Sequence, residues 1–548
     1  MHSYLNVMVS EQVILKSFTK RLDHLGIIAT IVEELGIVDL VNARLPKLRH
    51  HILTHGDVVL ALILNGLGFT HRRLYLFSAW FENKPVQRLF RKDVVATDFT
   101  DDVIGRTLDA IKEYGPELLY QEIISQIYLK TRFGPLWMHL DTTNFSVHGA
   151  YDTPDASATI RITKGHPKDG RWELNRFGLG LIVSQVGIPL FMKLLSGNDN
   201  DKTTLPEMLA QFRSQVEFHD PLHCIADSAF YSENSLKRLD GKVFFITLVP
   251  GTVGEQQALL SRDLPFTPMT DPRYSFFETK SEYGGVHQKW VVYRSAEGHK
   301  KEEKTLEKNR LKKEKMVRKA LVHLQKLEFA CEKDALAEAA RWIRAFPHYT
   351  FESVSVVTRQ KRASGCRGRP KKDEVTRTVY SLEASIMPDE VVWAAERATL
   401  GRFVLATNDL SLSPEELLTQ YKNQGVVESG FRFLKDASFA ISDVFLKKIG
   451  RIEALGMMMV MMLAVYSIGE YQLRTRLAQR GATLLNQVGK PTANPTLKWV
   501  MTFFDGVVEL YRHDPVTDTV QYEGVLNMSD RCWDVVKVFG PICEKYYA

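Results

Sequence analysis

Short apolar runs alternate with a helical pattern in the first half of the chain, and polar or turn-forming residues bound each run. Runs of this length with such boundaries indicate buried strands. Two of them flank Gly187 closely enough to predict a hairpin. Strands interleaved with a helix predict a mixed α/β core. The expected strands cover 136–140, 179–185, 188–195, 224–226 and 243–249, and a helix is expected over 203–216.

The segments outside this core differ from it in pattern. Near the N-terminus, Thr54 and Asp57 are spaced as a capping box, and Gly115-Pro116 ends one helical pattern where another can begin. A further strand is expected at 403–407. The expected divisions are a helical domain at 1–130, a core in two parts at 131–250 and 401–480, a separate charged segment at 251–400, and a helical C-terminal region at 481–548.

The composition is that of a folded protein, with 45% hydrophobic and 25% charged residues in 548. The five cysteines are scattered, so neither a disulfide framework nor a cysteine zinc site is expected, and a reducing compartment is. The N-terminus lacks the pattern of a signal peptide. The most apolar stretch, 455–468, is 14 residues long, below the roughly 18 that span a bilayer, and predicts a buried core helix. A soluble intracellular protein is therefore expected.

Basic residues are clustered although the net charge is only +6. Residues 299–319 hold ten basic residues against four glutamates, on an expected long helix or helical hairpin. Residues 359–372 hold seven basic residues and no acid, in an expected loop. Arg367-Gly368-Arg369-Pro370 within it matches the core of an AT-hook, followed by Lys371 and Lys372. Minor-groove binding, general phosphate contact and a solvated loop are the three interpretations of this segment.

Three carboxylates stand out by their positions. Asp141 and Asp227 each end an expected buried strand. Glu428 lies on an expected helix that Ser413 caps. The residues Tyr421, Gln424, Glu428 and Lys435 are separated by three, four and seven positions, which predicts that all four share one face of that helix.

Three such carboxylates can hold two divalent cations about 3.5–4 Å apart, the arrangement for in-line displacement at a phosphodiester. Oxygen ligands favour Mg²⁺ or Mn²⁺ over zinc. The alternative interpretation is structural: Asp141 and Asp227 only terminate their strands.

The residues around these carboxylates resemble the DDE transposases of bacterial insertion sequences, and more narrowly the superfamily with a Y-x2-R-x3-E-x6-K signature. Here the signature consists of Tyr421, Gln424, Glu428 and Lys435, with glutamine in place of the arginine. The other matching motifs are Asp141-Thr142-Thr143-Asn144, Leu195-Ser196-Gly197-Asn198 and 225–231. The resemblance covers roughly residues 130–250 and 400–470.

The resemblance implies an RNase H-like core with an insertion domain at 251–400, since Asp227 and Glu428 are 428 − 227 = 201 positions apart. Asp141, Asp227 and Glu428 would be the catalytic residues and the ligands of two Mg²⁺ ions, with Mn²⁺ as a substitute. Lys435 would contact a phosphate of the element's end, and Tyr421 would position the same strand. Gln424 lacks the charge for the bidentate phosphate clamp of an arginine.

The implied activity is cleavage at the ends of an element followed by strand transfer, which is transposition by cut-and-paste. The implied partners are double-stranded DNA, both terminal inverted repeats and target, and a second copy of the chain in a homodimer on DNA. The N-terminal domain would bind the ends, and 481–548 would serve dimerisation, in the nucleoid of a bacterium or archaeon. Two alternatives stay open: a nuclease of the same fold without strand transfer, and a domesticated DNA-binding protein without catalysis.

Overall fold

The structure is a computed structural model, and its contacts divide the chain into two compact units. One unit comprises residues 1–246 and 420–548, and the other comprises 247–419. The residues described are 16–46, 52–69, 77–131, 137–149, 151, 158–165, 170–215, 222–239, 243–362, 376–436, 448–514 and 517–548.

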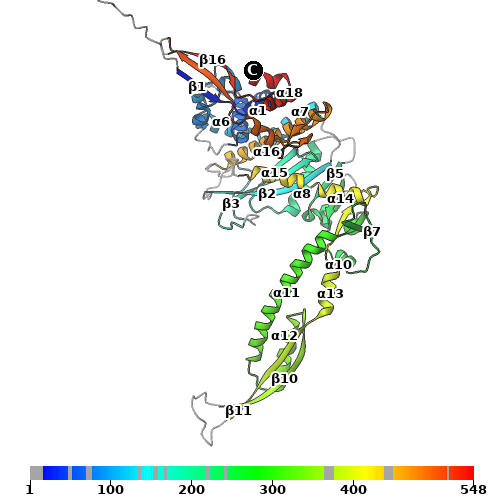
Figure 1. Ribbon diagram of the computed structural model, residues 1–548. Coiled ribbons are helices and arrows are strands. Elements are labelled where there is room, and N and C mark those ends of the chain that lie inside the picture. Colours follow the sequence, from blue (N-terminus) through cyan, green and yellow to red (C-terminus); the bar gives the residue numbers. More distant parts are fainter. Residues whose placement is uncertain are drawn as a thin grey trace, which may run out of the picture. The chain divides into compact units, whose positions relative to one another are not determined.

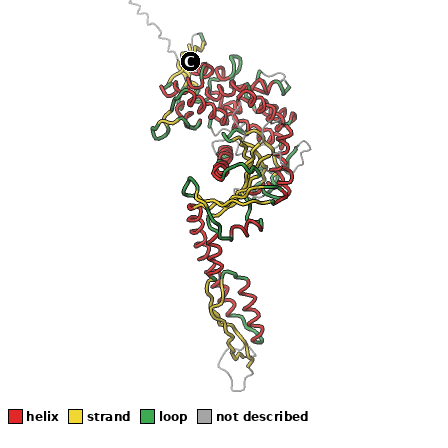
Figure 2. The backbone as a smooth tube through the Cα atoms, turned by 90° about the vertical axis from the view of Figure 1, so that its right-hand side faces the viewer, coloured by secondary structure: helices red, strands yellow, loops and turns green. Residues whose placement is uncertain are grey.

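The N-terminal part of the first unit is helical, as predicted, apart from the strand β1 at Lys16–Arg21. Figure 1 shows α1 near the chain's C-terminus, where Figure 2 shows mostly helices, and α1 packs against the C-terminal helix α19 (Pro541–Tyr547). The helices are α1 Leu25–Leu35, α2 Ile37–Asn42, α3 His55–Leu67, α4 Phe77–Glu82, α5 Val86–Leu89, α6 Asp101–Tyr114 and α7 Pro116–Thr131, with the 3₁₀ turn η2 at Ala96–Asp98.

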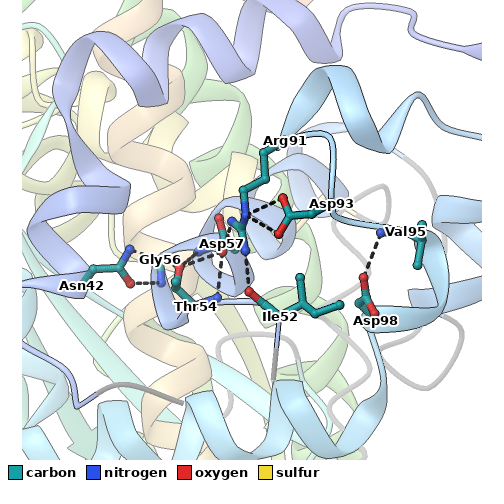
Figure 3. A network of polar contacts seen from close by, with 9 residues as sticks. All are labelled: Asn42, Ile52, Thr54, Gly56, Asp57, Arg91, Asp93, Val95 and Asp98. Carbon is teal, nitrogen blue, oxygen red and sulfur yellow. Dashed lines mark hydrogen bonds and ion pairs between the residues drawn. The ribbon is translucent and has the colours of Figure 1, made fainter. Parts of the chain in front are cut away.

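The predicted capping box at the start of α3 is present. The Thr54 amide donates to the Asp57 carboxylate over 2.7 Å, and the Asp57 amide donates back to the Thr54 hydroxyl over 3.1 Å. The same carboxylate receives the Arg91 guanidinium at 2.6 Å, and the Asn42 side chain accepts from the Gly56 amide (Figure 3). This network joins α2, α3 and the segment after α5, so the cap also fixes tertiary structure.

A mixed sheet runs through the middle of the first unit, and it confirms the predicted mixed α/β class. Its order is β4-β3-β2-β5-β6, with β2 antiparallel to β3 and parallel to β5. The predicted hairpin is β3-β4, with Gly187 at a φ of 87° in its turn. The strands are β2 Trp137–Val147, β3 Asn175–Ser184, β4 Pro189–Ser196, β5 Leu222–Ala226 and β6 Val243–Leu248.

Helices cover the two faces of this sheet, and the glycines bring them close. A Cβ at Gly180 of β3 would collide with Met208 of α8 (Asp201–Gln215), and a Cβ at Gly456 of α16 would crowd Leu194 of β4. Short helical segments follow β5, namely η3 Ser228–Phe230 and α9 Glu233–Leu239. The core therefore sits between α8, the sheet and α16.

Helix α16, Ile449–Gln479, contains the predicted core helix at 455–468. By length and composition alone, α16 is long and apolar enough to cross a membrane, but 89% of its apolar window is buried inside the protein. It packs against α1, α3, α6, α7 and β4. The prediction of a buried core helix is confirmed.

The prediction that 481–548 is helical is wrong for its middle part. The strands β15 Val508–Asp514 and β16 Thr519–Leu526 form a three-stranded sheet with β1, in the order β1-β15-β16. Phe18 of β1 stacks on Tyr511 of β15, with ring centroids 5.3 Å apart. The remaining elements are β13 Leu484–Leu485, β14 Pro491–Thr492, α17 Leu497–Met501, η6 Thr502–Phe504, α18 Asp530–Phe539 and α19 Pro541–Tyr547.

The second unit has a sheet of order β12-β9-β8-β7 and a long hairpin, β10-β11. Of the expected long helix or helical hairpin, the structure has the second, two helices α11 and α12 that both pack against the hairpin around Leu324, Ala339 and Leu382 (Figure 1). The elements are α10 Gly254–Leu260, β7 Thr267–Pro268, β8 Tyr274–Ser281, η4 Tyr283–Gly285, β9 Gln288–Ser295, α11 Ala296–Gln325, α12 Glu332–Arg344, β10 Tyr349–Arg362, β11 Thr376–Pro388, α13 Glu390–Ala398 and β12 Arg402–Thr407.

The basic segment 359–372 is not a loop throughout, because β10 continues to Arg362. Arg359 to Arg362 pair with Val379 to Thr376 of β11, so a ladder of backbone hydrogen bonds extends the strand beyond its apolar part. The rest of the basic segment, including Arg367, Arg369, Lys371 and Lys372, lies outside the described residues.

Candidate active site

Asp141 and Asp227 follow the last pair of the same parallel ladder. Strands β2 and β5 pair from Trp137–His223 to Leu140–Ala226, so the two aspartates occupy the next position on adjacent strands. Asp227 ends β5 as predicted, and its carboxylate accepts from the Ala229 amide over 2.8 Å to cap η3. Adjacent strands lie about 4.8 Å apart, so the ladder brings these two carboxylates side by side.

Asp141 does not end its strand, which contradicts the prediction. β2 continues for six residues to Val147, because the antiparallel partner β3 pairs with it as far as Asn175. The apolar run of β2 stops at Leu140, which is also where its pairing with β5 ends. Beyond that point β2 pairs only with the antiparallel strand β3, and an antiparallel strand can carry polar residues on one face. Asp141 therefore lies at the end of the parallel ladder between β2 and β5, and in the middle of the antiparallel ladder between β2 and β3.

The expected single helix after Ser413 is two helices, α14 Pro414–Lys422 and α15 Gly425–Leu434. The capping box of Ser413 and Glu416 is present. Between the helices, the amides of Gln424 and Val427 bond three residues back instead of four, which tightens the chain ahead of Gly425. Glu428 and Lys435 stay seven positions apart along α15, whereas Tyr421 and Gln424 precede it.

Helix α15 packs on β2 and α16, with Val427, Phe431 and Leu434 buried as predicted (Figure 1). The Lys435 ammonium at the end of α15 lies 5.8 Å from the ring centroid of Phe145. Phe145 and Asp141 share a face of β2 and are about 13 Å apart along it. Seven helical residues span about 10 Å, so a helix parallel to the strand brings Glu428 level with Asp141.

The surroundings of Tyr421 support a parallel course of α15 and β2. Burial raises the pKa of its hydroxyl, and the negative charges of Asp227 and Glu428 raise it further. One hydroxyl that feels both carboxylates requires the start of α15 to face the ends of β2 and β5. The hydroxyl is therefore protonated at neutral pH and can donate a hydrogen bond.

The three carboxylates are neighbours but are not gathered into a ligand cluster. Asp141 and Asp227 are half-buried and Glu428 is exposed. In the part of the chain that the structure describes, no three His, Cys, Asp or Glu side chains are close enough together to hold a metal ion. The donor chemistry nevertheless fits a hard cation, since all the donors are carboxylate oxygens.

Comparison with known protein families decides the class of protein. Residues 139–465, more than half of the chain, match the family described as Transposase DDE domain. The chain belongs to the DDE transposase family. Residues 17–125 match a separate domain of unknown function, DUF4277. No curated protein matches this transposase.

The family match covers the α/β sheet from His139 of β2 onward and reaches into α16. The RNase H-like class expected of the transposase is thereby shown, and so is its place among proteins of DNA transposition and recombination. Of the other residues singled out by the sequence, Gln424 is half-buried at the start of α15 without a side-chain capping bond, and Lys435 is exposed.

One residue near the site of the transposase escaped the sequence prediction. His139 precedes Asp141 by two positions, so both side chains point to the same face of β2. It is fully buried, and within the described residues neither ring nitrogen has a hydrogen-bond partner. Burial lowers the pKa of His139 to about 4, so the imidazole is neutral at physiological pH. A histidine within an apolar run was the only sequence signal.

Proposed function

We propose that this transposase cleaves DNA at the ends of its element and transfers the freed 3′-hydroxyl to target DNA, with Asp141, Asp227 and Glu428 as its catalytic residues. The observation that carries the proposal is the ladder end shared by Asp141 and Asp227, together with the hydroxyl of Tyr421 that feels Asp227 and Glu428. A family of DNA-transposing enzymes and a carboxylate site at one sheet edge support the same chemistry.

Asp141, Asp227 and Glu428 would hold two Mg²⁺ ions, which supply a Lewis acid on each side of the scissile phosphate when bound. Glu428 is the exposed member of the three, so it can turn toward the aspartates as DNA and metal bind. Thr142 donates its amide to the Asp141 carboxylate over 2.7 Å, which holds that oxygen in place. Glu428 would therefore join the two aspartates as a metal ligand only in the complex with DNA and Mg²⁺.

Tyr421 and Lys435 would position the DNA around this site. The Tyr421 hydroxyl is protonated and lies near two carboxylates, so it can donate to a carboxylate or to a phosphate oxygen. Lys435, at the end of α15, would neutralise a phosphate farther along the same strand. Gln424 offers hydrogen bonds without a charge, so it would contribute less to DNA affinity than an arginine there.

The remaining assignments are part of the same proposal. The helices of residues 1–130 would recognise the terminal repeats, and the basic residues Arg367, Arg369, Lys371 and Lys372 would contact DNA from the second unit. Two copies would act together on two DNA ends, with 481–548 contributing to dimerisation. Such a protein would work on the chromosome in the cytoplasm of a bacterium or archaeon, by excision and reinsertion.

The test compares three proteins on one DNA. Wild type, Glu428→Gln and the matched control Glu307→Gln, an exposed helical glutamate in α11, are incubated with Mg²⁺ and a labelled duplex carrying one end of the element. Denaturing gels should show cleavage with 3′-OH products for wild type and the control, and at least a 10³-fold slower rate for Glu428→Gln, as expected for loss of a metal ligand (on the order of 4 kcal/mol).

Each other outcome points to a different protein. Binding without cleavage by the wild type would overturn the enzymatic proposal in favour of a domesticated DNA-binding protein. Nicking that ignores the element's end would indicate a nuclease without strand transfer. Cleavage by Glu428→Gln at the wild-type rate would remove Glu428 from the site. Omitting Mg²⁺ should abolish cleavage and leave DNA binding measurable.

A further inference from the structure

Strands β2 and β3 continue past the carboxylates to an end of the sheet where three separate segments are joined. Thr163 and Arg176 exchange backbone hydrogen bonds, of 3.3 and 3.0 Å. The Gly197 amide donates to the Arg161 carbonyl over 3.0 Å, and the Arg161 amide donates to the Ser196 hydroxyl over the same distance. The segment 158–165 is therefore docked on the ends of β3 and β4.

Two glycines, Gly165 and Gly197, allow the backbone of segment 158–165 to contact the backbone at the ends of β3 and β4 directly. A Cβ at Gly165 would collide with the carbonyl oxygen of Gly197, and a Cβ at Gly197 would collide with the carbonyl oxygens of Thr163 and Arg176. Ile160 and Ile162 are buried, so alternate side chains of the segment anchor it to the core. The side chains between them, such as Arg161, point out to solvent.

Two buried charged side chains hold the backbone of this region from below. Glu453 of α16 is fully buried, and its carboxylate accepts from the Thr159 and Ile160 amides at 2.7 and 3.0 Å. Arg176 is 1% exposed and donates to the carbonyls of Arg171 and Leu174 at 2.6 and 3.3 Å. Charge-assisted hydrogen bonds of this kind fix the turn 171–174 and the segment 158–165 in one conformation.

The surface that this scaffold presents is basic and aromatic. Arg161, Lys164 and Arg171 are exposed, and the indole of Trp172 is 60% exposed, an unusual state for the largest apolar side chain. The acids in the same segments are Glu173 and Asp199, and the Asp199 carboxylate accepts from the Ser196 amide. We call the four residues Arg161, Lys164, Arg171 and Trp172 the Trp172 platform.

We propose that the Trp172 platform binds the DNA duplex whose scissile bond occupies the carboxylate site, about five base pairs from that bond. Arg176 pairs with Ser146, which is five residues beyond Asp141 on β2 and so about 17 Å from it. B-form DNA advances about 3.4 Å per base pair, which converts this distance to about five base pairs. The cations contact phosphates, and the indole packs on a sugar or base. The inference rests on the proposed function for the position of the scissile bond.

The test measures binding in the Glu428→Gln background, so that it needs no cleavage. Fluorescence anisotropy over a range of KCl concentrations compares Arg161→Ala/Lys164→Ala with a control pair from α12, Lys333→Ala/Arg341→Ala, which also removes one exposed lysine and one exposed arginine. The platform variant should bind at least tenfold more weakly, and the slope of log K against log salt should fall by about 2, close to 0.9 per phosphate lost. The control pair should leave both unchanged.

Trp172 is tested by two substitutions. Trp172→Ala should weaken binding about tenfold, and Trp172→Phe should restore most of it, because a smaller ring still packs on a sugar or base. Thermal unfolding of each variant should match the parent, since all the substituted side chains are exposed. Equal binding by Trp172→Ala would overturn the role of the indole.

Ethylation interference on the same duplex locates the contact. Phosphates about five base pairs from the cleavage position should interfere with binding by the parent and not by Arg161→Ala/Lys164→Ala. The proposal would be overturned if Arg161→Ala/Lys164→Ala had the same salt slope as the parent. It would also be overturned if the interference that this variant loses lay far from the position about five base pairs from the cleavage site. Absence of cleavage by wild type, with these binding effects intact, would instead overturn the proposed function alone.

Discussion

His139 is a buried imidazole within two positions of a proposed catalytic aspartate, and it shows how far a single residue can depend on its surroundings. Its ring is fully buried, and burial lowers its pKa from 6.5 to about 4. The unfolded chain therefore takes up a proton at this residue between pH 6.5 and 4, whereas the folded chain does not. Acidification through this window favours unfolding.

We predict that His139→Leu removes this contribution. Wild type and variant should have similar free energies of unfolding at pH 7, and the variant should be more stable by about 2 kcal/mol at pH 5, the linkage expected for a pKa change from 6.5 to about 4. Urea denaturation at both pH values measures the difference. If the free energies of unfolding of the two proteins changed equally with pH, the imidazole of His139 would take up its proton in the folded state as readily as in the unfolded state.

Helix α15 illustrates what one element does for the site. Its buried stripe, Val427, Phe431 and Leu434, attaches it to the core, while Glu428 and Lys435 remain at its exposed surface. The break before Gly425 separates Tyr421, near the end of α14, from Glu428 on α15, and the Tyr421 hydroxyl feels the charges of both Asp227 and Glu428. Asn423 and Gly425 are poor helix formers, which is why the break falls there.

Gly425→Ala tests whether the break needs glycine itself. The residue does not have a positive φ, and a Cβ there would have no heavy atom within 4 Å. Alanine restricts the unfolded chain more than glycine does, so the variant should be stabilised by about 0.5–1 kcal/mol with unchanged cleavage. Thermal unfolding and the single-turnover cleavage rate are the two measurements. Higher stability with slower cleavage would show that the break must flex during the reaction.

At the scale of the whole molecule, residues from opposite ends of the numbering share one core. β1 pairs with β15, and Tyr547 of α19, 1% exposed, donates its hydroxyl to the Asp23 carbonyl over 2.8 Å. A Cβ at Gly26 of α1 would crowd the ring of Tyr547, so this helix accepts the tyrosine only because position 26 is glycine. The helical N-terminal part is completed by the C-terminal segment.

The ring of Tyr547 should therefore contribute strongly to stability. We expect Tyr547→Ala to lower the free energy of unfolding by about 3–5 kcal/mol through the cavity it leaves, and Tyr547→Phe to lower it by about 1 kcal/mol through the lost hydrogen bond. Urea titration of the two variants beside wild type provides the comparison. An alanine variant as stable as the phenylalanine variant would mean that the C-terminal helix does not form part of the N-terminal core.

The amino-acid sequence alone determined the features that depend on neighbouring residues. The capping boxes at Thr54 and Ser413, the hairpin at Gly187 and the core helix at 455–468 follow from local hydrogen bonding and apolar patterning, and each is present. The three carboxylates were found because Asp141, Asp227 and Glu428 lie at recognisable positions in motifs, and the family match supports the class of protein.

Features that depend on partners distant in the chain emerged only in the folded structure. Asp141 lies within a strand because β3 continues beside it, β15 is a strand because β1 pairs with it across almost the whole sequence, and α15 is docked because its apolar stripe packs on β2 and α16. Strand pairing and helix docking draw their stability from surfaces that local sequence does not contain. The exposure of Trp172 and the burial of His139 were decided in the same way.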